Sequence, residues 1–472
     1  MKKHTCHLLL SSLLLFAHAG QGKAAASPNT STLPPRIRQV AEAYLDTELT
    51  SGMTLIYIEG DKAPAIVSLG NTDYKGRGFP ITPDSRFEIG SLTKLFTGLL
   101  VAKCVSAKAC DLQQSIQDLS PGTILSKDLQ NTRLIELLTH SSGLPALPSN
   151  FEPQNPEDPY ADYNETLLKA YLQEATTEDK GTHRYSNIGF GLLGYLMVQH
   201  LTPGSEKNDL QQLMHNNILA PLGMTSASFD DLESLKLAVL PHQEGDQSQR
   251  WHFQDTTAGA GALRASGQDM ARFLAASMHP ELIREPALRQ AMKESQRVLR
   301  SESQLKSPVA VAYAWHRYPV LGKAVMGHSG QTGGFVSFIG FDSERKRGAV
   351  ILSNDTTDVS PLGLAMVMPS FPLSPPKDQR QAEAVLQPYV GTYELTPDFS
   401  IQVTQRRGYL YVQGTGQAAL KIIPDSTSPD RFNVEGVKAS IRFERNTKGM
   451  INGLILDQDN IQQKAPRITE KK

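Results

Sequence analysis

The spacing of apolar residues changes near residue 375, and this change divides the chain into two parts that need different folds. Up to that point, long helical runs lie between a few strand-like runs. The segment SFPLSPPKDQRQ then replaces the apolar periodicity with proline, serine and charge. Beyond it, short alternating runs such as YVGTYEL, FSIQVTQ and YLYVQG follow at turn-separated intervals. We expect a first domain over residues 27–375 and a second over residues 376–472.

The first part carries strand-like runs at both of its ends and helical runs between them. MTLIYIEG and APAIVSLG flank a turn near its start, and GHSGQTGGFVSFIGFD and RGAVILSND flank a charged turn near its end. The middle contains SLTKLFTGLLVAKCV and IGFGLLGYLMVQHL, which are typical of buried helices. This order predicts an α/β fold, an antiparallel sheet flanked by helices plus an all-helical region. The second part predicts a small all-β, barrel-like domain, which we interpret as lipocalin-like.

The N-terminus has the composition of a secretory signal. Two lysines precede the apolar run LLLSSLLLF, and the small residues of AHA follow it. We expect residues 1–26 to be this signal peptide. The apolar run is too short to cross a membrane core, which needs about 20 residues, and each later run is soon interrupted by charge or proline. The sequence predicts a periplasmic or secreted protein without a stable membrane span.

Charge and residue types exclude several classes of partner. The chain has 47 Lys and Arg against 48 Asp and Glu, so it lacks the positive excess that grips a phosphate backbone, and no nucleic-acid partner is expected. The 12 histidines are scattered, without a His-Glu-x-x-His motif, so no metal and no cofactor is expected. After loss of the signal, Cys104 and Cys110 remain. Their spacing permits a disulfide in an oxidising compartment, and two separate buried thiols are the alternative.

Ser91 and Lys94 place a hydroxyl and an amine three residues apart at the start of an apolar helix, so both project from one face. The amine can take the hydroxyl proton where burial lowers its pKa, and free N–H groups at the helix start favour a developing negative charge. The same spacing recurs at 303–306 and 343–346, but in a polar stretch and a charged turn, where a lysine stays solvated. We therefore expect Ser91 as the nucleophile and Lys94 as a proton-handling partner.

Two further segments carry polar groups suited to catalysis. Tyr185 and Asn187 precede the run IGFGLLGYLM, and they supply a phenol for proton transfer and an amide to hold a carbonyl; the same segment also fits a simple helix cap. His328 and Gly330 open the strand HSGQTGGFVSFIG, where glycine lets a substrate backbone approach and an imidazole can bond a carboxylate or the tyrosine. His140, in LLTHSSGLP, is expected to be structural and to bond a loop.

In order and rough spacing, Ser-x-x-Lys, Tyr-x-Asn and His-x-Gly resemble the serine penicillin-recognising superfamily. The resemblance is closest to its class C branch, which includes class C β-lactamases, AmpH-type D-Ala-D-Ala carboxypeptidases, D-aminopeptidases and related esterases. It covers residues from about 35 to 365 and includes the phrases FEIGSLTKLFTG, LIELLTHSSGLP, APLGM and AGALRASGQDMARFL.

The resemblance implies an acyl-enzyme cycle. Ser91 would attack a carbonyl, Lys94 and Tyr185 would relay the proton, and Asn187 would orient the substrate amide. The backbone N–H groups of Ser91 and Gln331 would form the oxyanion hole. His328, Gly330 and Gln331 would then border the substrate.

The substrate stays open between several classes. A penicillin-binding D-Ala-D-Ala carboxypeptidase or endopeptidase, or a class C-like β-lactamase, would act on peptidoglycan peptides or β-lactams. Class C β-lactamases usually carry Lys where this chain has His328, and a neutral imidazole binds a carboxylate less strongly than an ammonium. A carboxylesterase or D-aminopeptidase is the alternative, and a binding or sensor protein that acts through its C-terminal module is a third. The loops 144–163 and 242–258, expected to shape the pocket, carry no readable specificity signal.

Overall fold

The computed structural model describes residues 30–468, except for residues 75–76, 205–208, 231–236, 377–378, 398, 416, 418, 426–427, 436, 438 and 459–460. The expected signal peptide, residues 1–26, lies outside the described residues. The chain divides into two compact units, one up to Pro375 and one from Pro376 onward. The first unit has two apolar cores and the second has one.

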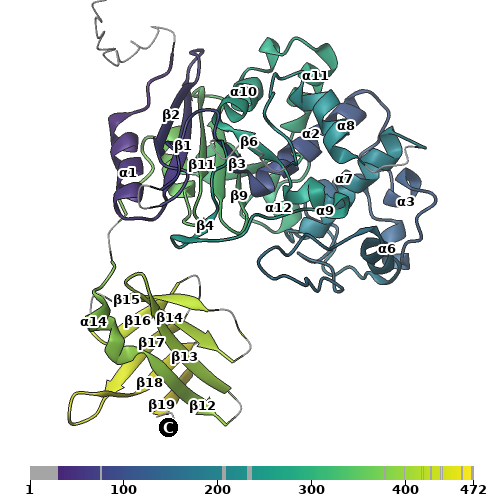
Figure 1. The fold of residues 1–472 in the computed structure, drawn as a ribbon. Coiled ribbons are helices and arrows are strands. Elements are labelled where there is room, and N and C mark those ends of the chain that lie inside the picture. Colours follow the sequence, from purple (N-terminus) through teal and green to yellow (C-terminus); the bar gives the residue numbers. More distant parts are fainter. Residues whose placement is uncertain are drawn as a thin grey trace, which may run out of the picture. The chain divides into compact units, whose positions relative to one another are not determined.

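A seven-stranded antiparallel sheet forms the centre of the first unit (Figure 1). Its strand order, β2-β1-β11-β10-β9-β8-β7, brings the start and the end of the unit together, because β1 pairs with β11 along its length. The predicted antiparallel sheet, built from both ends of the domain, is thereby confirmed. The strands are β1 (Gly52–Glu59), β2 (Ala65–Gly70), β7 (Ala310–Val311), β8 (His316–Val320), β9 (Lys323–Gln331), β10 (Val336–Asp342) and β11 (Arg347–Ser353).

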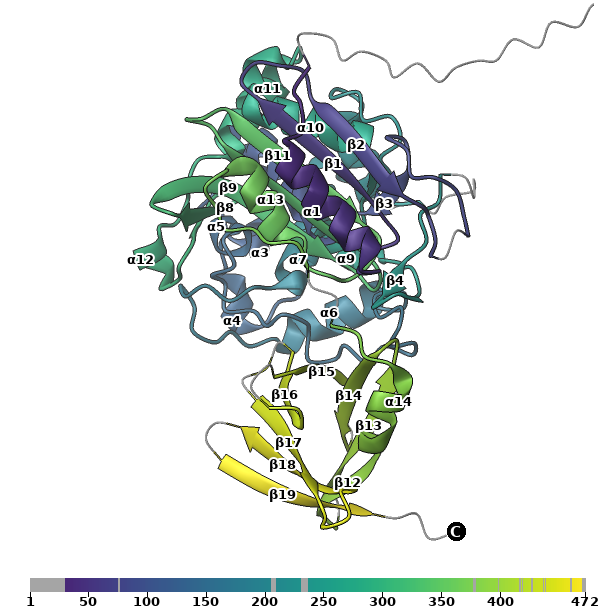
Figure 2. The same cartoon turned by 90° about the vertical axis from the view of Figure 1, so that its left-hand side faces the viewer.

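Two helices cover one face of this sheet. They are α1 (Pro35–Asp46) and α13 (Ser360–Val367), which lie next to each other across β1 and β11 (Figure 2). In α1 the buried residues Ile37, Val40, Ala41 and Tyr44 recur at helical spacing, so one apolar stripe faces the sheet. These helices and the strands beneath them share one of the two cores of the unit.

The opposite face of the sheet packs against the helical region, whose centre is formed by α2 (Thr93–Ser106) and α7 (Asn187–Leu201) (Figure 1). Both helices are apolar on nearly all sides and are therefore buried. The other helical elements of the unit are η1 (Gly90–Leu92), α3 (Ile116–Leu119), α4 (Lys127–Gln130), α5 (Leu134–Leu138), α6 (Glu165–Glu174), α8 (Leu210–Met214), η2 (His215–Leu219), α9 (Asp255–Gly261), α10 (Gly267–Met278), η3 (Pro280–Leu282), α11 (Pro286–Ser295) and α12 (Glu302–Leu305). Two small ribbons pair β3 (Arg86–Glu88) with β6 (Arg264–Ser266), and β4 (His242–Gln243) with β5 (Asp246–Gln247).

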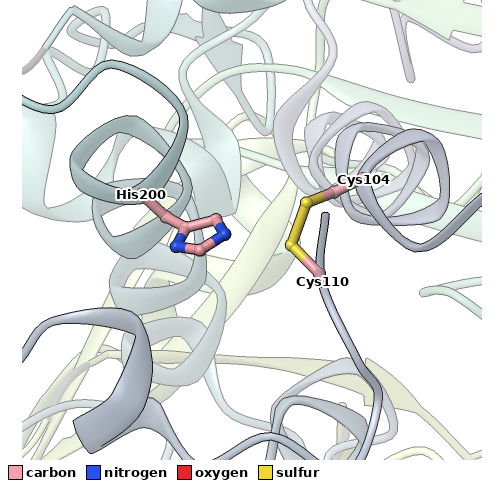
Figure 3. A group of neighbouring side chains, drawn as sticks. All are labelled: Cys104, Cys110 and His200. Atoms are coloured by element: carbon pink, nitrogen blue, oxygen red, sulfur yellow. A yellow bond between two sulfur atoms is a disulfide. The ribbon is translucent and has the colours of Figure 1, made fainter. Parts of the chain in front are cut away.

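Cys104 and Cys110 form a disulfide, which decides between the two possibilities that the sequence left open. It ties the last turn of α2 to the segment that follows (Figure 3). His200 lies close to both sulfur atoms, and its Nε2 is 2.9 Å from the carbonyl oxygen of Ala109, between the two cysteines. Because a disulfide sulfur is not a thiolate ligand, this group braces the end of α2 in the oxidised protein.

The second unit is a closed barrel of eight antiparallel strands, which confirms the predicted all-β, barrel-like domain. Neighbouring strands in the chain are neighbours in the barrel, and β12 pairs with β19 to close it. A short helical segment, α14 (Glu383–Leu386) and η4 (Gln387–Tyr389), precedes the first strand. The strands are β12 (Gly391–Thr396), β13 (Phe399–Arg406), β14 (Tyr409–Gly414), β15 (Leu420–Pro424), β16 (Arg431–Val434), β17 (Ala439–Arg445), β18 (Ile451–Gln458) and β19 (Ile461–Ile468). Among the described residues of the whole chain, no helix combines the length and apolarity needed to cross a bilayer.

Candidate active site

Ser91 lies in the short 3-10 turn η1, which follows strand β3 and runs directly into helix α2, so it stands at the start of the helix as expected from the sequence. Gly90 makes this turn possible because its φ of +50° is in the left-handed region. A Cβ at Gly90 would also lie 2.7 Å from the backbone nitrogen of Gln331. The glycine therefore lets strand β9 pass directly beside Ser91.

Lys94 is completely buried, and its ammonium nitrogen has three partners. The Nζ atom lies 2.8 Å from Ser91 Oγ, 2.8 Å from Asn187 Oδ1 and 2.8 Å from the carbonyl oxygen of Ala260. The amide oxygen and the carbonyl can only accept hydrogen bonds. A neutral amine would donate its two protons to them and would keep its lone pair for the hydroxyl proton of Ser91. The three contacts therefore suit an uncharged base as well as an ammonium.

Burial acts in opposite directions on the two proton-handling groups. It lowers the pKa of Lys94 well below its usual range, and it raises the pKa of Tyr185 above its usual value. The Tyr185 hydroxyl donates to Ser91 Oγ over 2.8 Å. Both shifts favour the neutral amine with the neutral phenol. Lys94 is thus the group better suited to accept the Ser91 proton, and Tyr185 is suited to pass a proton on.

The segment around Tyr185 serves two purposes at once. Ser186 caps helix α7 by accepting a hydrogen bond from the backbone nitrogen of Gly189, as the helix-cap interpretation predicted. The same cap fixes Tyr185 just before the helix and Asn187 at its first position. Tyr185 therefore reaches Ser91, and Asn187 reaches Lys94. The two interpretations of this motif are compatible.

Gly330 and Gln331 line the cleft beside Ser91. A Cβ at Gly330 would lie 2.2 Å from the carbonyl oxygen of Ile89 and 3.0 Å from the backbone nitrogen of Ser91. Only glycine permits this approach of β9. The backbone of the strand therefore borders the nucleophile on the side where the resemblance places the oxyanion hole. The cleft has a volume of about 270 Å³, and its described lining is Ser91, Tyr185, Ser329, Gly330, Gln331, Val336, Ser337, Thr356 and Asp358.

His328 occupies a different place from the one expected. It lies inside β9, which begins at Lys323, and does not open the strand. Its side chain is 2% exposed and is not part of the cleft lining. The Nδ1 atom lies 2.6 Å from the carbonyl oxygen of Ser329, and the ring centroid is 6.3 Å from that of Tyr185. The imidazole therefore stands behind the tyrosine instead of facing a substrate carboxylate.

His328 belongs to a cluster of four imidazoles, three of them buried and that of His183 partly buried, which sequence reasoning did not find. His316 stacks on His328 at 4.8 Å, His183 lies 5.7 Å from His316, and His140 lies 4.4 Å from the ring of Tyr185. In all of them Nε2 is buried with no hydrogen-bond partner among the described residues. Burial lowers the pKa of every member, that of His316 to about 4. The cluster is thus an uncharged wall behind the catalytic tyrosine.

His140 also carries the role expected of it, because its Nδ1 accepts a hydrogen bond from the backbone nitrogen of Ser186 over 3.0 Å. That bond holds the loop which presents Tyr185. His140 adopts a φ of +53°, so this loop contact is built into a tight backbone turn. The four imidazoles come from segments far apart in the chain, and no local motif marks them.

The two loops that were expected to shape the pocket pack on each other. Tyr160, from the first loop, stacks on Phe253 of the second at 4.5 Å and receives a hydrogen bond from Asn187 Nδ2 over 3.2 Å. The first loop also bonds the second through Asp158, which lies 2.7 Å from His252 Nδ1. The loops therefore reach the catalytic asparagine through Tyr160, a contact that the spacing of the sequence did not indicate.

The Ser-x-x-Lys tetrads at 303–306 and 343–346 behave as the sequence predicted. Lys346 ion-pairs with Asp61 in an exposed hairpin turn, with Nζ 2.9 Å from the carboxylate. Lys306 is exposed and ends the short helix α12 in a left-handed conformation. Only the tetrad at Ser91 and Lys94, among these three, is joined by a hydrogen bond within the buried core.

Comparisons with known proteins show the family of the first unit. The family model described as Beta-lactamase matches residues 37–366. The chain is similar to "Protein flp" of Staphylococcus aureus strain N315, with 23% identity over 70% of this chain, and it spans 65% of that protein's length. It is also similar to a β-lactamase of Yersinia enterocolitica, with 24% identity over 62% of this chain and 80% of that protein.

A solved class C β-lactamase shares the fold of the first unit, with a TM-score of 0.61 and 20% identity over 72% of this chain and 96% of that one. The match to the family model covers most of the first unit and includes every residue of the cleft and of the imidazole cluster. The chain therefore belongs to the β-lactamase family of serine hydrolases.

Proposed function

We propose that this protein is an exported hydrolase that forms an acyl-enzyme on Ser91, as a penicillin-binding D-Ala-D-Ala carboxypeptidase or endopeptidase of the AmpH type, or as a slow class C-like β-lactamase. The observation that carries the proposal is the position of Ser91 Oγ, 2.8 Å from Lys94 Nζ and 2.8 Å from the Tyr185 hydroxyl. A nucleophile held between a depressed-pKa amine and a neutral phenol is equipped for acyl transfer.

The cycle follows from these contacts. Ser91 Oγ forms a bond to the substrate carbonyl carbon while its proton moves to Lys94 Nζ. Backbone N–H groups of Ser91 and Gln331 stabilise the oxyanion. As the C–N bond breaks, a proton passes through Tyr185 to the leaving nitrogen. Water then attacks the ester and gives its proton to the same groups, which releases the acid and restores Ser91.

Export is supported by two independent observations. The N-terminal residues have the composition of a secretory signal, and the disulfide between Cys104 and Cys110 is of a kind that persists in oxidising compartments. We propose a periplasmic or secreted location. Substrates would then be peptidoglycan peptides or β-lactams that reach the protein outside the cytoplasm.

The charge of the cleft favours a second candidate within the same chemistry. Among the described residues that line the cleft, Asp358 carries the only charge. His328 is buried and is not part of the lining. Asp358 would repel a carboxylate substrate and attract an ammonium, and it would have little effect on an uncharged ester. A D-aminopeptidase or a carboxylesterase is therefore the alternative.

Intact-mass spectrometry after brief exposure to benzylpenicillin tests the acyl-enzyme. Wild type should gain one penicilloyl adduct, and Ser91→Ala should gain none. The lifetime of the adduct separates a slow penicillin-binding peptidase from a β-lactamase. No adduct on wild type, with no loss of the drug, would leave only the ester and aminopeptidase candidates.

Three chromogenic substrates separate the remaining classes. Nitrocefin carries a carboxylate, D-alanine p-nitroanilide carries an ammonium, and p-nitrophenyl acetate is uncharged. A D-Ala-D-Ala peptide completes the set. Asp358→Asn should raise kcat/KM for nitrocefin and lower it for the ammonium substrate if Asp358 selects by charge. Equal changes for all of them would remove Asp358 from the specificity argument.

A further inference from the structure

The barrel of the second unit contains a cavity of about 500 Å³ near one of its ends. Its lining comes from the strand ends on either side of four hairpin connections: β12 to β13, β14 to β15, β16 to β17, and β18 to β19. Alternate connections of an up-and-down barrel lie at the same end, so these strand ends surround one mouth. The described lining residues are Leu395, Thr396, Phe399, Ile401, Val412, Gly414, Gln417, Leu420, Val434, Val437, Ala439, Ile441, Leu456, Gln458 and Gln463.

The other half of the barrel is filled and closed. Tyr389, Tyr393, Phe432 and Phe443 pack there edge to face, with ring centroids 4.8 to 5.7 Å apart. Tyr389 lies in the helical segment before the first strand and donates to Asp430 over 2.7 Å.

Hydrogen bonds from two arginines stabilise the same end of the barrel. Arg445 bonds both carboxylate oxygens of Asp430, at 2.8 and 2.9 Å, and Arg467 donates to the carbonyl oxygen of Pro388 over 3.1 Å. An eight-stranded barrel is just wide enough for its side chains to fill it or to hold one small ligand. In this barrel, side chains fill one half, and the other half has room for one small ligand.

The described lining of the cavity is apolar, with neutral polar groups where it is exposed. None of these described residues carries a charge. Two of the exposed lining side chains are apolar, since Leu420 is 39% and Val437 41% exposed. Gln417, Gln458 and Gln463 supply amide groups that can each donate and accept hydrogen bonds. The volume lies within the range of about 300–1,000 Å³ that small-molecule sites occupy.

We propose that this cavity is a binding site for a single-chain amphiphile with an uncharged, hydrogen-bonding head, such as a monoacylglycerol. The apolar chain would lie between the inward faces of β13, β14 and β17, and the head would meet the glutamine amides at the rim. A charged head is disfavoured because it would lose hydration without meeting an opposite charge among the described lining residues. The proposal concerns the barrel alone and stands whether or not Ser91 acts on β-lactams.

Fluorescence of N-phenyl-1-naphthylamine in the full mature chain tests the site. The uncharged probe should brighten on binding, and 1-monolauroylglycerol should displace it. Laurate and dodecyltrimethylammonium, which have chains of the same length, should displace it about tenfold less strongly. Binding should be unaffected by Ser91→Ala, since the cleft and the cavity share no residue.

Two variants and one control locate the binding. Val412→Trp fills the cavity and should abolish displaceable fluorescence. Val437→Glu puts a charge at an exposed position on the rim, where the fold tolerates it. It should weaken the binding of monolauroylglycerol about tenfold. Gln402→Trp places the same side chain as the first variant on the outside of β13, between the buried Ile401 and Val403, and should bind like wild type.

The outcomes divide cleanly. Loss in Val412→Trp and weakening in Val437→Glu, with normal binding in the control, support the site. Absence of brightening in wild type, equal binding in all variants, or tighter binding of either charged amphiphile would each overturn the proposal.

Discussion

The catalytic cleft of the first unit and the cavity of the second unit differ most in what lies behind their walls. The cleft, at about 270 Å³, is the smaller, and a buried lysine, three buried histidines and the partly buried His183 stand behind it. The cavity, at about 500 Å³, has apolar side chains and neutral amides as its described lining. Burial shifts a pKa only where a titratable group is present. Events in the cleft should therefore depend strongly on pH, whereas binding in the barrel should not.

Each unit offers its own spectroscopic signal for testing this contrast. The chain has two tryptophans, Trp251 and Trp315, and both lie in the first unit. Their fluorescence reports on the hydrolase unit. Binding of N-phenyl-1-naphthylamine reports on the barrel. A change confined to one unit should move only one of these signals.

The largest effect is expected from Lys94→Met, which removes the amine and keeps an unbranched side chain of similar length. Acylation by benzylpenicillin at pH 7 should fall by about 10²- to 10⁴-fold, because Lys94 supplies the only amine that contacts Ser91 among the described residues. In wild type the rate should rise with pH through the lowered pKa of Lys94, since only the neutral amine accepts a proton. Stopped-flow or quenched mass spectrometry measures both.

The barrel provides the internal control for that variant. Probe binding should be the same in wild type and Lys94→Met from pH 5 to pH 8. Equal acylation rates in the two proteins would refute the base assignment. A probe affinity that changes with pH would contradict the expected difference in pH dependence between the cleft and the barrel cavity.

A smaller loss is expected from Gly330→Ala. The added methyl group would lie 2.2 Å from the carbonyl oxygen of Ile89, so β9 must move away from Ser91. A displacement of about 1 Å in a catalytic site costs about 100-fold in rate, and acylation should fall by that amount. Gly122→Ala is the matched control, because a Cβ there meets nothing within 4 Å. Similar acylation in the two variants would contradict the proposed role of this close approach.

Removing the disulfide should destabilise only the first unit. Cys104→Ser with Cys110→Ser opens a short loop, and loop-closure entropy predicts a loss of about 2 kcal/mol in the free energy of unfolding. Denaturant unfolding followed by tryptophan fluorescence measures it. Loss of probe binding at an unchanged denaturant concentration would show that the barrel is unaffected. An equal shift of both transitions would mean that the two units unfold together.

The smallest effect is expected from acid acting on the imidazole cluster. The pKa of His316 falls from about 6.5 to about 4 on folding, so at lower pH the unfolded chain binds a proton that the folded chain refuses. Stability is therefore complete above pH 6.5 and declines as the pH falls below it. From pH 7 to pH 5.5 this group should cost about 1 kcal/mol.

His316→Phe keeps a ring in the stack and should remove that part of the pH dependence. Tryptophan-detected unfolding of wild type and variant at both pH values gives the difference. Parallel pH profiles would contradict the assignment of His316 as a buried neutral group. Probe-detected unfolding of the barrel serves as the reference in each experiment.

Features that depend on local pattern were predictable from the sequence. The tetrad at Ser91 was separable from those at 303–306 and 343–346 because its lysine lies in an apolar helix, and burial of Lys94 follows from that. The sheet was predictable because its strand runs stand at both ends of the domain. The barrel was predictable because its strands alternate and follow one another closely.

Features that depend on tertiary contacts were not predictable. His140, His183, His316 and His328 come from separate segments and meet only after the sheet and the helical region pack. The sequence placed His328 at a strand edge beside glycine, where an imidazole could have faced either side. Alternation along the barrel strands shows which side chains point inward, but it gives no sign of whether the interior is filled. The empty half of the barrel follows from where its aromatic side chains gather.

The pairing of β1 with β11 also governs the order of events during synthesis. Met53 pairs with Ser353 in the register of β1 and β11. The centre of the sheet therefore cannot form until a strand 300 residues later in the chain has been synthesised. Contacts this distant in sequence form slowly. The barrel, by contrast, grows by hairpins between successive strands and needs only the pairing of β12 with β19 to close. A nascent chain that ends before residue 347 lacks β11, the strand that joins β1 to β10. The catalytic site around Ser91 therefore forms only when the hydrolase unit is nearly complete.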